Sequence, residues 1–126
     1  MRDRTSLNPT EAKMKIDMKE YNDVVVLEVK GNLMGGPETI AVHDKVKELI
    51  DSGKKKIVID LASVKWMNSS GLGTLMGCMT SLCNAEGSLK LSRVTDKVKS
   101  LFIVTKLMTI FDTYESPEDA VAAFQK

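Results

Sequence analysis

The sequence of 126 residues has few of the side chains on which catalytic and metal sites usually depend. It contains one histidine and two cysteines, and aromatic residues make up only 5% of it. The cysteines are not in a Cys-x-x-Cys motif and no histidine cluster accompanies them, which excludes zinc and thioredoxin-like chemistry. We therefore expect no metal ion and no cofactor. With so few aromatic residues, the core must be filled by Val, Ile, Leu and Met.

Charge and hydropathy exclude two further classes of partner. The 18 basic and 17 acidic residues give a net charge of +1, too small to attract nucleic acid or an anionic membrane. No apolar run approaches the length of a spanning helix, and the N-terminus has no signal-peptide apolar region. We therefore expect a cytoplasmic protein that binds neither nucleic acid nor membrane directly. Cys78 and Cys83 are expected to be small buried or half-buried residues.

The length predicts one domain that can bury a core without metals or disulfides. Residues 1–13 have no periodic apolar pattern and are expected to form a flexible lead-in, followed by the domain over residues 14–126.

Strand and helix patterns alternate along this domain. Residues 14–19 alternate apolar and polar side chains, and residues 24–29 predict a second strand, paired with the first as a hairpin. A buried strand is expected from residue 56 and shorter strands around residues 89–91 and 110–114. Helices are expected from Pro37, after Ser69 and Ser70, from a cap at Asp96 and from Ser116. The alternation predicts an α/β domain with one mixed sheet of about four to five strands, packed with about four helices.

The most informative segment joins the buried strand to the second helix. Its strand is the β-branched run Ile57-Val-Ile59, and Asn68, Ser69 and Ser70 then supply N-cap residues. Gly71 and Gly73 remove side chains where a backbone or a partner must come close. Two hydroxyl groups are thus expected at the positive end of a helix, where an added phosphate is tolerated. The helix is expected to bury one stripe, formed by Leu72, Leu75, Met76, Met79, Leu82 and Cys83.

The residues needed for an enzyme are missing. His43 is the only histidine, and no Gly-x-Ser-x-Gly motif is present, so neither serine has a predicted base. The Gly71-Leu-Gly73 run lacks the frame and the lysine of a phosphate-binding loop. We expect a protein that catalyses no reaction.

Three segments resemble one family. Asp60-Leu-Ala-Ser-Val-Lys-Trp-Met-Asn-Ser-Ser-Gly-Leu-Gly73 is similar to the signature of the STAS domain of bacterial anti-sigma-factor antagonists. Val98 to Ala120 resembles the C-terminal pattern of that family, and Gly31-Asn-Leu33 resembles a third motif. The resemblance covers the chain from about Met14 onward, and it implies the STAS topology.

The resemblance also implies a function. Ser69 corresponds to the serine that a partner phosphorylates in the family, with Ser70 as the second choice. That partner is both an anti-sigma factor and a serine kinase of the histidine-kinase-like ATPase class. The unphosphorylated antagonist binds the kinase and frees a sigma factor, phosphorylation releases the kinase, and a serine phosphatase resets the cycle. The expected partner-binding residues are Met34, Gly35, Asn68, Ser69, Ser70, Gly71, Leu72 and Gly73.

Three positions depart from the family pattern. Asn68 and Met34 stand where the family has aspartate, so both remove negative charge near the serines. Lys106 stands where glycine is common and is expected to be structural, because it lies near a helix end. Asn68 and Met34 favour an alternative, a STAS scaffold or an accessory subunit of a transport complex that is not phosphorylated. The intact Ser69-Ser-Gly-Leu-Gly73 favours the antagonist, and homodimerisation is left open.

Overall fold

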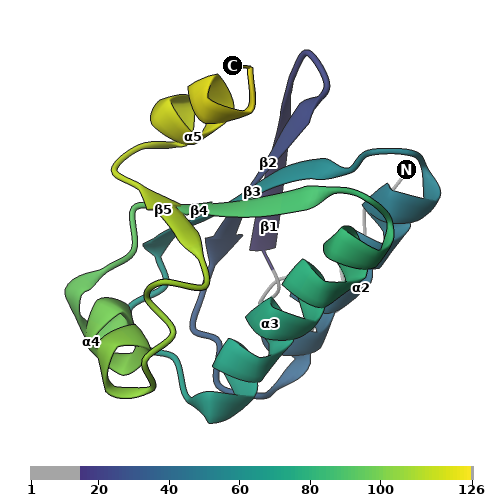
Figure 1. The fold of residues 1–126 in the computed structure, drawn as a ribbon. Coiled ribbons are helices and arrows are strands. Elements are labelled where there is room, and N and C mark those ends of the chain that lie inside the picture. The colour runs from purple at the N-terminus through teal and green to yellow at the C-terminus, as the bar shows by residue number, and fades with distance from the viewer. Residues whose placement is uncertain (1–14, 126) are drawn as a thin grey trace.

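The computed structural model describes residues 15–125; the expected lead-in over residues 1–13 and the strand start at Met14 lie outside this range. Strands and helices alternate as the sequence predicts (Figure 1). In chain order the elements are β1 (Lys15–Tyr21), β2 (Val24–Lys30), α2 (Pro37–Asp51), β3 (Lys56–Ser63), α3 (Ser69–Asn84), β4 (Ser88–Ser92), α4 (Asp96–Val104), β5 (Asp112–Tyr114) and α5 (Pro117–Phe124).

The strands form one mixed sheet in the order β1-β2-β3-β4-β5. The predicted hairpin is confirmed, because β1 and β2 pair antiparallel around a turn in which Asn22 has a φ of 62°. The remaining neighbours pair parallel, which requires a crossover helix between them. The expected fold class is therefore confirmed, with five strands and four helices in the described part of the chain.

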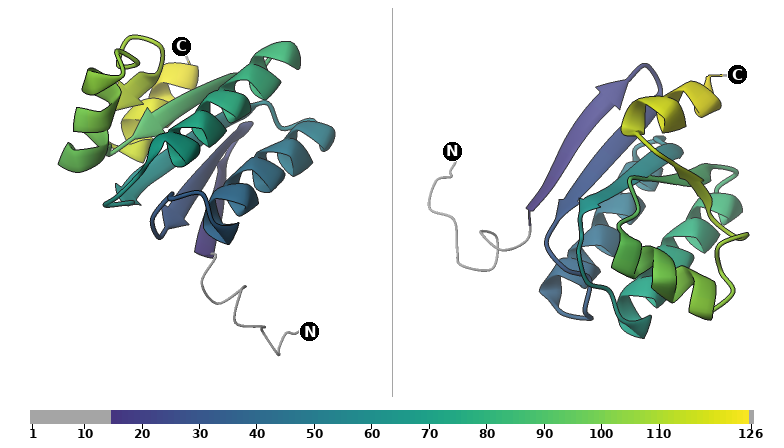
Figure 2. Two further views of the ribbon diagram at one scale, coloured as in Figure 1. Left: turned by 90° about the horizontal axis from the view of Figure 1, so that it is seen from below. Right: turned by 90° about the vertical axis from the view of Figure 1, so that its left-hand side faces the viewer.

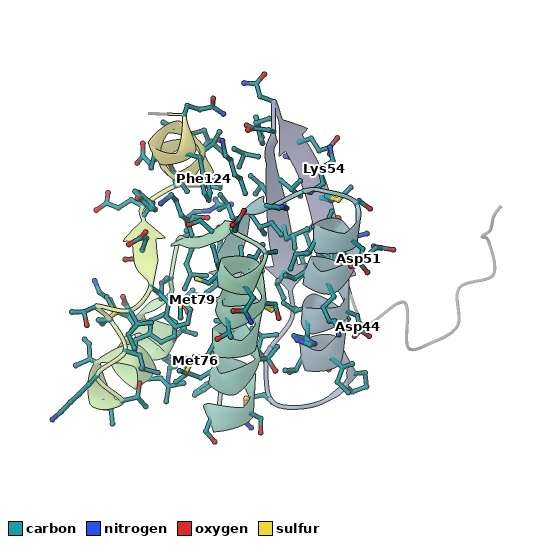
Figure 3. The ribbon with its side chains drawn as sticks, turned by 45° about the vertical axis from the view of Figure 1, so that its right-hand side comes forward. Asp44, Asp51, Lys54, Met76, Met79 and Phe124 are labelled. Atoms are coloured by element: carbon teal, nitrogen blue, oxygen red, sulfur yellow. The ribbon has the colours of Figure 1, made fainter. Side chains whose placement is uncertain are left out.

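The two faces of the sheet are covered unequally (Figure 2). Alternate residues of the central strands point toward α2, α3 and α4, where the main core lies. Met76 and Met79 of α3 are partly buried and pack against this core (Figure 3). The opposite face is covered by α5, and its smaller cluster consists of Val24, Val26, Val58 and Ala120. No helix within residues 15–125 is both long enough and apolar enough to cross a membrane.

Three helices end in the same hydrogen-bond pattern. In α4 the Leu107 amide donates to Phe102 O at 2.8 Å, and the Lys106 amide donates to Ile103 O at 3.0 Å. This pair of bonds is the Schellman motif, which requires a left-handed residue after the cap. The left-handed residues are Gly53 after α2, Glu86 after α3 and Lys106 after α4. The expectation that Lys106 is a structural position is confirmed, since its φ is 62°.

Two details of the expected helices are wrong. Asp96 does not cap α4, because Thr95 is the N-cap residue and its hydroxyl donates to Val64 O at 2.7 Å. Cys83 is exposed, whereas Cys78 is buried and takes its place in the apolar stripe of α3. Burial raises the pKa of the Cys78 thiol to about 12. The rest of the predicted stripe is retained, because Leu72, Leu75 and Leu82 are buried and both methionines pack against the core.

We predict that Lys106→Gly and Glu86→Gly each stabilise the fold. Left-handed backbone costs a residue with a Cβ about 1 kcal/mol, and glycine removes that cost. The gain is reduced by the greater freedom of glycine in the unfolded chain, so we expect up to about 1 kcal/mol in urea unfolding. Lys99→Gly is the matched control, since this exposed lysine lies inside α4 and its replacement should destabilise by about 0.5–1 kcal/mol. A loss of stability in Lys106→Gly would contradict the left-handed assignment.

Candidate functional site

The loop between β3 and α3 is paired with a second loop that precedes α2. Leu33 forms an isolated parallel bridge with Met67. Its amide donates to Trp66 O at 3.1 Å, and its carbonyl accepts from the Asn68 amide at 3.2 Å. Asn32 Oδ1 accepts from the Trp66 amide at 3.1 Å. Two segments far apart in the sequence are therefore joined through their backbones at the start of α3.

Asn68 connects the same two loops through its side chain. As the N-cap residue of α3 it accepts a hydrogen bond from the Gly71 amide at 3.0 Å through Oδ1. Its Nδ2 donates to Met34 O at 3.0 Å. The amide is therefore acceptor on one side and donor on the other. An ionised aspartate has no donor and could form the first bond but not the second.

Two glycines allow the loops to approach this closely. A Cβ on Gly71 would lie 2.2 Å from Leu33 O, so this position has no room for any side chain. Gly35 has a φ of +95°, and a Cβ there would lie 3.1 Å from Ser70 Cβ. The Gly35 amide donates to Thr39 Oγ1 at 2.9 Å, and Thr39 is buried. These contacts place the residues before α2 directly against the first turn of α3.

The hydroxyl groups of Ser69 and Ser70 lie in the first turn of α3 and are exposed. The first four amides of a helix lack partners within the helix. In α3 the Asn68 amide donates to Leu33 O and the Gly71 amide to Asn68 Oδ1. No acceptor among residues 15–125 takes up the amides of Ser69 and Ser70. Because the first turn also contains no acidic residue, this end of the helix keeps its positive potential.

Six of the eight expected partner-binding residues lie on one surface, which we call the serine surface. Met34 is 51% exposed, and Gly73 is exposed, with open space on the side where a Cβ would project. The other two, Gly71 and Leu72, are buried and support the loop from below. The members of the serine surface are Met34, Gly35, Asn68, Ser69, Ser70 and Gly73.

Sequence reasoning missed two exposed apolar residues near this surface. Ile40 on α2 is 60% exposed, and its position outside the buried stripe of Val42, Val46 and Leu49 was the available signal. Trp66, in the loop before α3, is 50% exposed. The Lys97 ammonium lies 4.0 Å from the centre of its ring, a cation–π contact that the sequence did not indicate.

Asp60, which opens the signature segment, has a structural environment. Its carboxylate is buried and accepts hydrogen bonds from Ser92 Oγ and Arg93 Nε, both at 3.0 Å. Arg93 Nη2 donates to the other oxygen, and hydrogen bonding to Asp60 raises the pKa of Arg93. Asp60, inside β3, is thus joined to the end of β4, where it pairs with Ser92. Within residues 15–125 no group of three His, Cys, Asp or Glu side chains could bind a metal ion.

Known proteins share both the sequence pattern and the fold of this chain. The family model of the STAS domain matches residues 15–120. The chain is 26% identical to the anti-sigma-B factor antagonist of Bacillus subtilis, over 86% of this chain and 97% of that protein. An anti-sigma factor antagonist from Mycobacterium paratuberculosis has a similar structure, with a TM-score of 0.79 and 20% identity over 94% of this chain and 98% of its own. The Bacillus cell fate determinant SpoIIAA in its phosphorylated form also has a similar structure, with a TM-score of 0.69. It is 20% identical, and the match covers 87% of this chain and 99% of its own.

We predict that Asn68→Ala lowers the free energy of unfolding by about 1–2 kcal/mol, because it removes the cap. Asn68→Asp keeps an acceptor for the Gly71 amide but loses the bond to Met34 O. It should therefore cost less stability while raising amide hydrogen exchange at Gly35. Urea unfolding and exchange measured by NMR check both effects. Asn84→Ala, at the exposed far end of α3, should change stability by less than about 0.5 kcal/mol. Unchanged exchange at Gly35 in Asn68→Asp would contradict the bridging role.

Proposed function

The chain belongs to the STAS domain family, and from that premise we propose that it is an anti-sigma-factor antagonist that binds its partner through the serine surface. The proposal is supported by the relatives, of which several are named as antagonists of an anti-sigma factor. The observation that carries it is the pair of exposed hydroxyls of Ser69 and Ser70, at a helix start that two loops position rigidly.

The proposed partner is an anti-sigma factor that is also a serine kinase of the histidine-kinase-like ATPase class. With Ser69 unmodified, the chain binds this kinase in the cytoplasm and a sigma factor is released. Phosphorylation of Ser69 ends the interaction, and a serine phosphatase restores the binding form. In this cycle the chain is a binding protein and a kinase substrate, and it catalyses no step itself.

The geometry of α3 is compatible with a phosphate on Ser69. The open amides of Ser69 and Ser70 and the helix dipole both favour an anion at this position. The neutral side chain of Asn68 adds no negative charge beside it. The cost of the phosphate therefore falls on the complex, where about −1.5 to −2 charges must enter a surface fitted to a hydroxyl. A complete reversal from bound to free requires about 5.5 kcal/mol of differential affinity.

The two serines differ in their surroundings. The Ser70 side chain lies against Gly35, where a Cβ would come within 3.1 Å of Ser70 Cβ. A Cβ on Gly35 or Gly36 would make no comparable contact with Ser69. This difference supports Ser69 as the phosphorylated residue, with Ser70 second.

The alternative is a STAS scaffold or transport-complex subunit that is never phosphorylated. The bond from Asn68 Nδ2 to Met34 O favours it, because this bond gives Asn68 a structural role that does not depend on phosphorylation. Phosphosite mapping on the protein from its own host, in growth and under stress, separates the two. Phosphate on Ser69 that changes with condition supports the antagonist, and an unmodified Ser69 in every condition supports the scaffold.

We predict that Ser69→Asp binds the kinase at least about 10-fold more weakly than the unmodified chain. Ser69→Ala should bind the kinase and remain in the binding form, even when ATP is present. The negative charge opposes the complex, whereas removal of the hydroxyl prevents phosphorylation. Binding is measured by calorimetry against each purified host kinase of the histidine-kinase-like ATPase class. Gln125→Glu adds the same charge at the exposed end of α5, on the opposite face of the sheet, and is the matched control. Equal affinities for Ser69→Asp and the unmodified chain would overturn the charge mechanism.

We predict that Gly73→Ala has opposite effects on folding and on binding. Alanine is favoured over glycine inside a helix by about 0.5–1 kcal/mol, and nothing in the fold opposes a Cβ at this position. The variant should therefore be more stable in urea yet bind the kinase more weakly, because the partner would lose close approach to the helix. Gly77→Ala, one turn farther along α3, is the control for the gain in helix stability. A Cβ there would make only an ordinary contact with His43, so this variant should be stabilised while its kinase binding is unchanged. Unchanged kinase binding in Gly73→Ala would exclude position 73 from the interface.

A further inference from the structure

Trp66 lies on the same loop as the serine surface but outside it. Its carbonyl accepts from the Leu33 amide, and the Leu33 carbonyl accepts from the Asn68 amide. Its own amide donates to Asn32 Oδ1. The backbone of Trp66 is therefore fixed relative to Ser69 through two shared hydrogen bonds, although its ring is half exposed. A large aromatic side chain exposed on a rigid loop is the type of residue that anchors protein interfaces.

A hollow of about 200 Å³ lies beside the ring. Its floor is mostly apolar, and it lies between the Trp66 loop and the first turn of α4. Thr95 fixes this turn against the loop, because its hydroxyl donates to Val64 O at 2.7 Å. The hollow is therefore preformed and is large enough for one apolar side chain of a partner. Its lining residues are Lys65, Trp66, Thr95, Asp96 and Lys97.

The charges around the hollow favour an acidic neighbour. Two lysines, Lys65 and Lys97, and one aspartate, Asp96, line it, so the lining has a net positive charge. Neither lysine forms an ion pair with a carboxylate in the described part of the chain. The Lys97 ammonium instead lies 4.0 Å from the centre of the Trp66 ring. An ammonium over an aromatic face still has N–H groups that can donate to a carboxylate.

We propose that this hollow is a second contact site for the anti-sigma kinase, which inserts a large apolar side chain beside Trp66 and places an adjacent Asp or Glu against Lys97. This inference rests on the proposed function, because the kinase is the partner that binds the neighbouring serine surface. The contact does not include Ser69, so it contributes to the affinity of both the unmodified and the phosphorylated chain. The contact at Trp66 would raise the affinity of both forms, while phosphorylation of Ser69 would change the affinity between them.

The single tryptophan allows a direct test. The chain labelled with 5-fluorotryptophan gives one ¹⁹F resonance, which is followed during titration with the kinase that binds the unmodified chain. We expect this resonance to shift on binding, and Trp66→Ala to weaken binding by about 30-fold, the effect of a hot-spot residue. Lys97→Glu should also weaken binding, and Trp66→Phe should lose less than Trp66→Ala. Val104→Ala on α4 is the matched control, since Val104 is 78% exposed away from the hollow and should leave the affinity unchanged.

Whether the Trp66 contact acts independently of phosphorylation at Ser69 is tested in the Ser69→Asp variant. Trp66→Ala should weaken binding by the same factor there as in the unmodified chain. Urea unfolding of every variant excludes loss of the fold as the cause. An unchanged resonance with unchanged affinity of Trp66→Ala overturns this inference alone. If the unmodified chain binds none of the host kinases, the proposed function fails and this inference with it. If Trp66→Ala instead changes the mass of the free protein in light scattering, the occupant is a second copy of the chain and the inference is wrong.

Discussion

The site depends on the side chain of Asn68, a neutral group with one acceptor and one donor. Oδ1 accepts from the Gly71 amide and Nδ2 donates to Met34 O, so one amide joins the start of α3 to the loop before α2. Leu33 is buried in the main core and Met67 packs against it, so the two loops are held by the core as well as by each other. The two loops come so close that a Cβ on Gly71 would collide with Leu33 O, so only glycine fits at position 71. The exposed hydroxyls and the exposed Met34 therefore belong to one rigid unit rather than to two separate loops.

Below the two loops, several polar side chains form hydrogen bonds within the domain and so have structural roles. The buried carboxylate of Asp60 receives hydrogen bonds from Ser92 and Arg93, which join two neighbouring strands at the ends that bear the loops. The hydroxyl of Thr95 joins the next loop to Val64. Charged and polar groups at these ends are thus mostly engaged within the domain. What remains for a partner is a small set of hydroxyl, apolar and lysine side chains on a backbone that does not need to rearrange.

Local patterns in the sequence were sufficient for the elements, because most strands and helices have an apolar repeat or, as in β3, a continuous apolar run. A cap among Asn68, Ser69 and Ser70 also follows from local rules, whereas the structure identifies Asn68 as the capping residue. The bond from Asn68 to Met34 O could not be predicted, since it joins segments that only the folded chain brings together. The same holds for Gly71, whose need for glycine comes from the Leu33 carbonyl. Cys83 was misassigned because it lies at the margin of the apolar stripe of α3, near the end of the helix. Asp96 was misassigned because a helix begun one residue earlier fits the same pattern nearly as well.

The contact between Gly71 and Leu33 O has a consequence for how such a surface can diverge. Position 71 has space for no side chain, and position 35 combines a left-handed backbone with a close neighbour, so substitutions at either would disturb the frame. Positions 34, 69 and 73 are exposed and are not restricted in this way, whereas position 70 is exposed but lies against Gly35. Substitutions at the exposed positions are therefore compatible with the fold, whereas substitutions at the two glycines are not. The side chains that the surface presents to a partner can change one at a time while the backbone of the two loops stays the same. A lineage could exchange its partner in this way without passing through an unfolded ancestor.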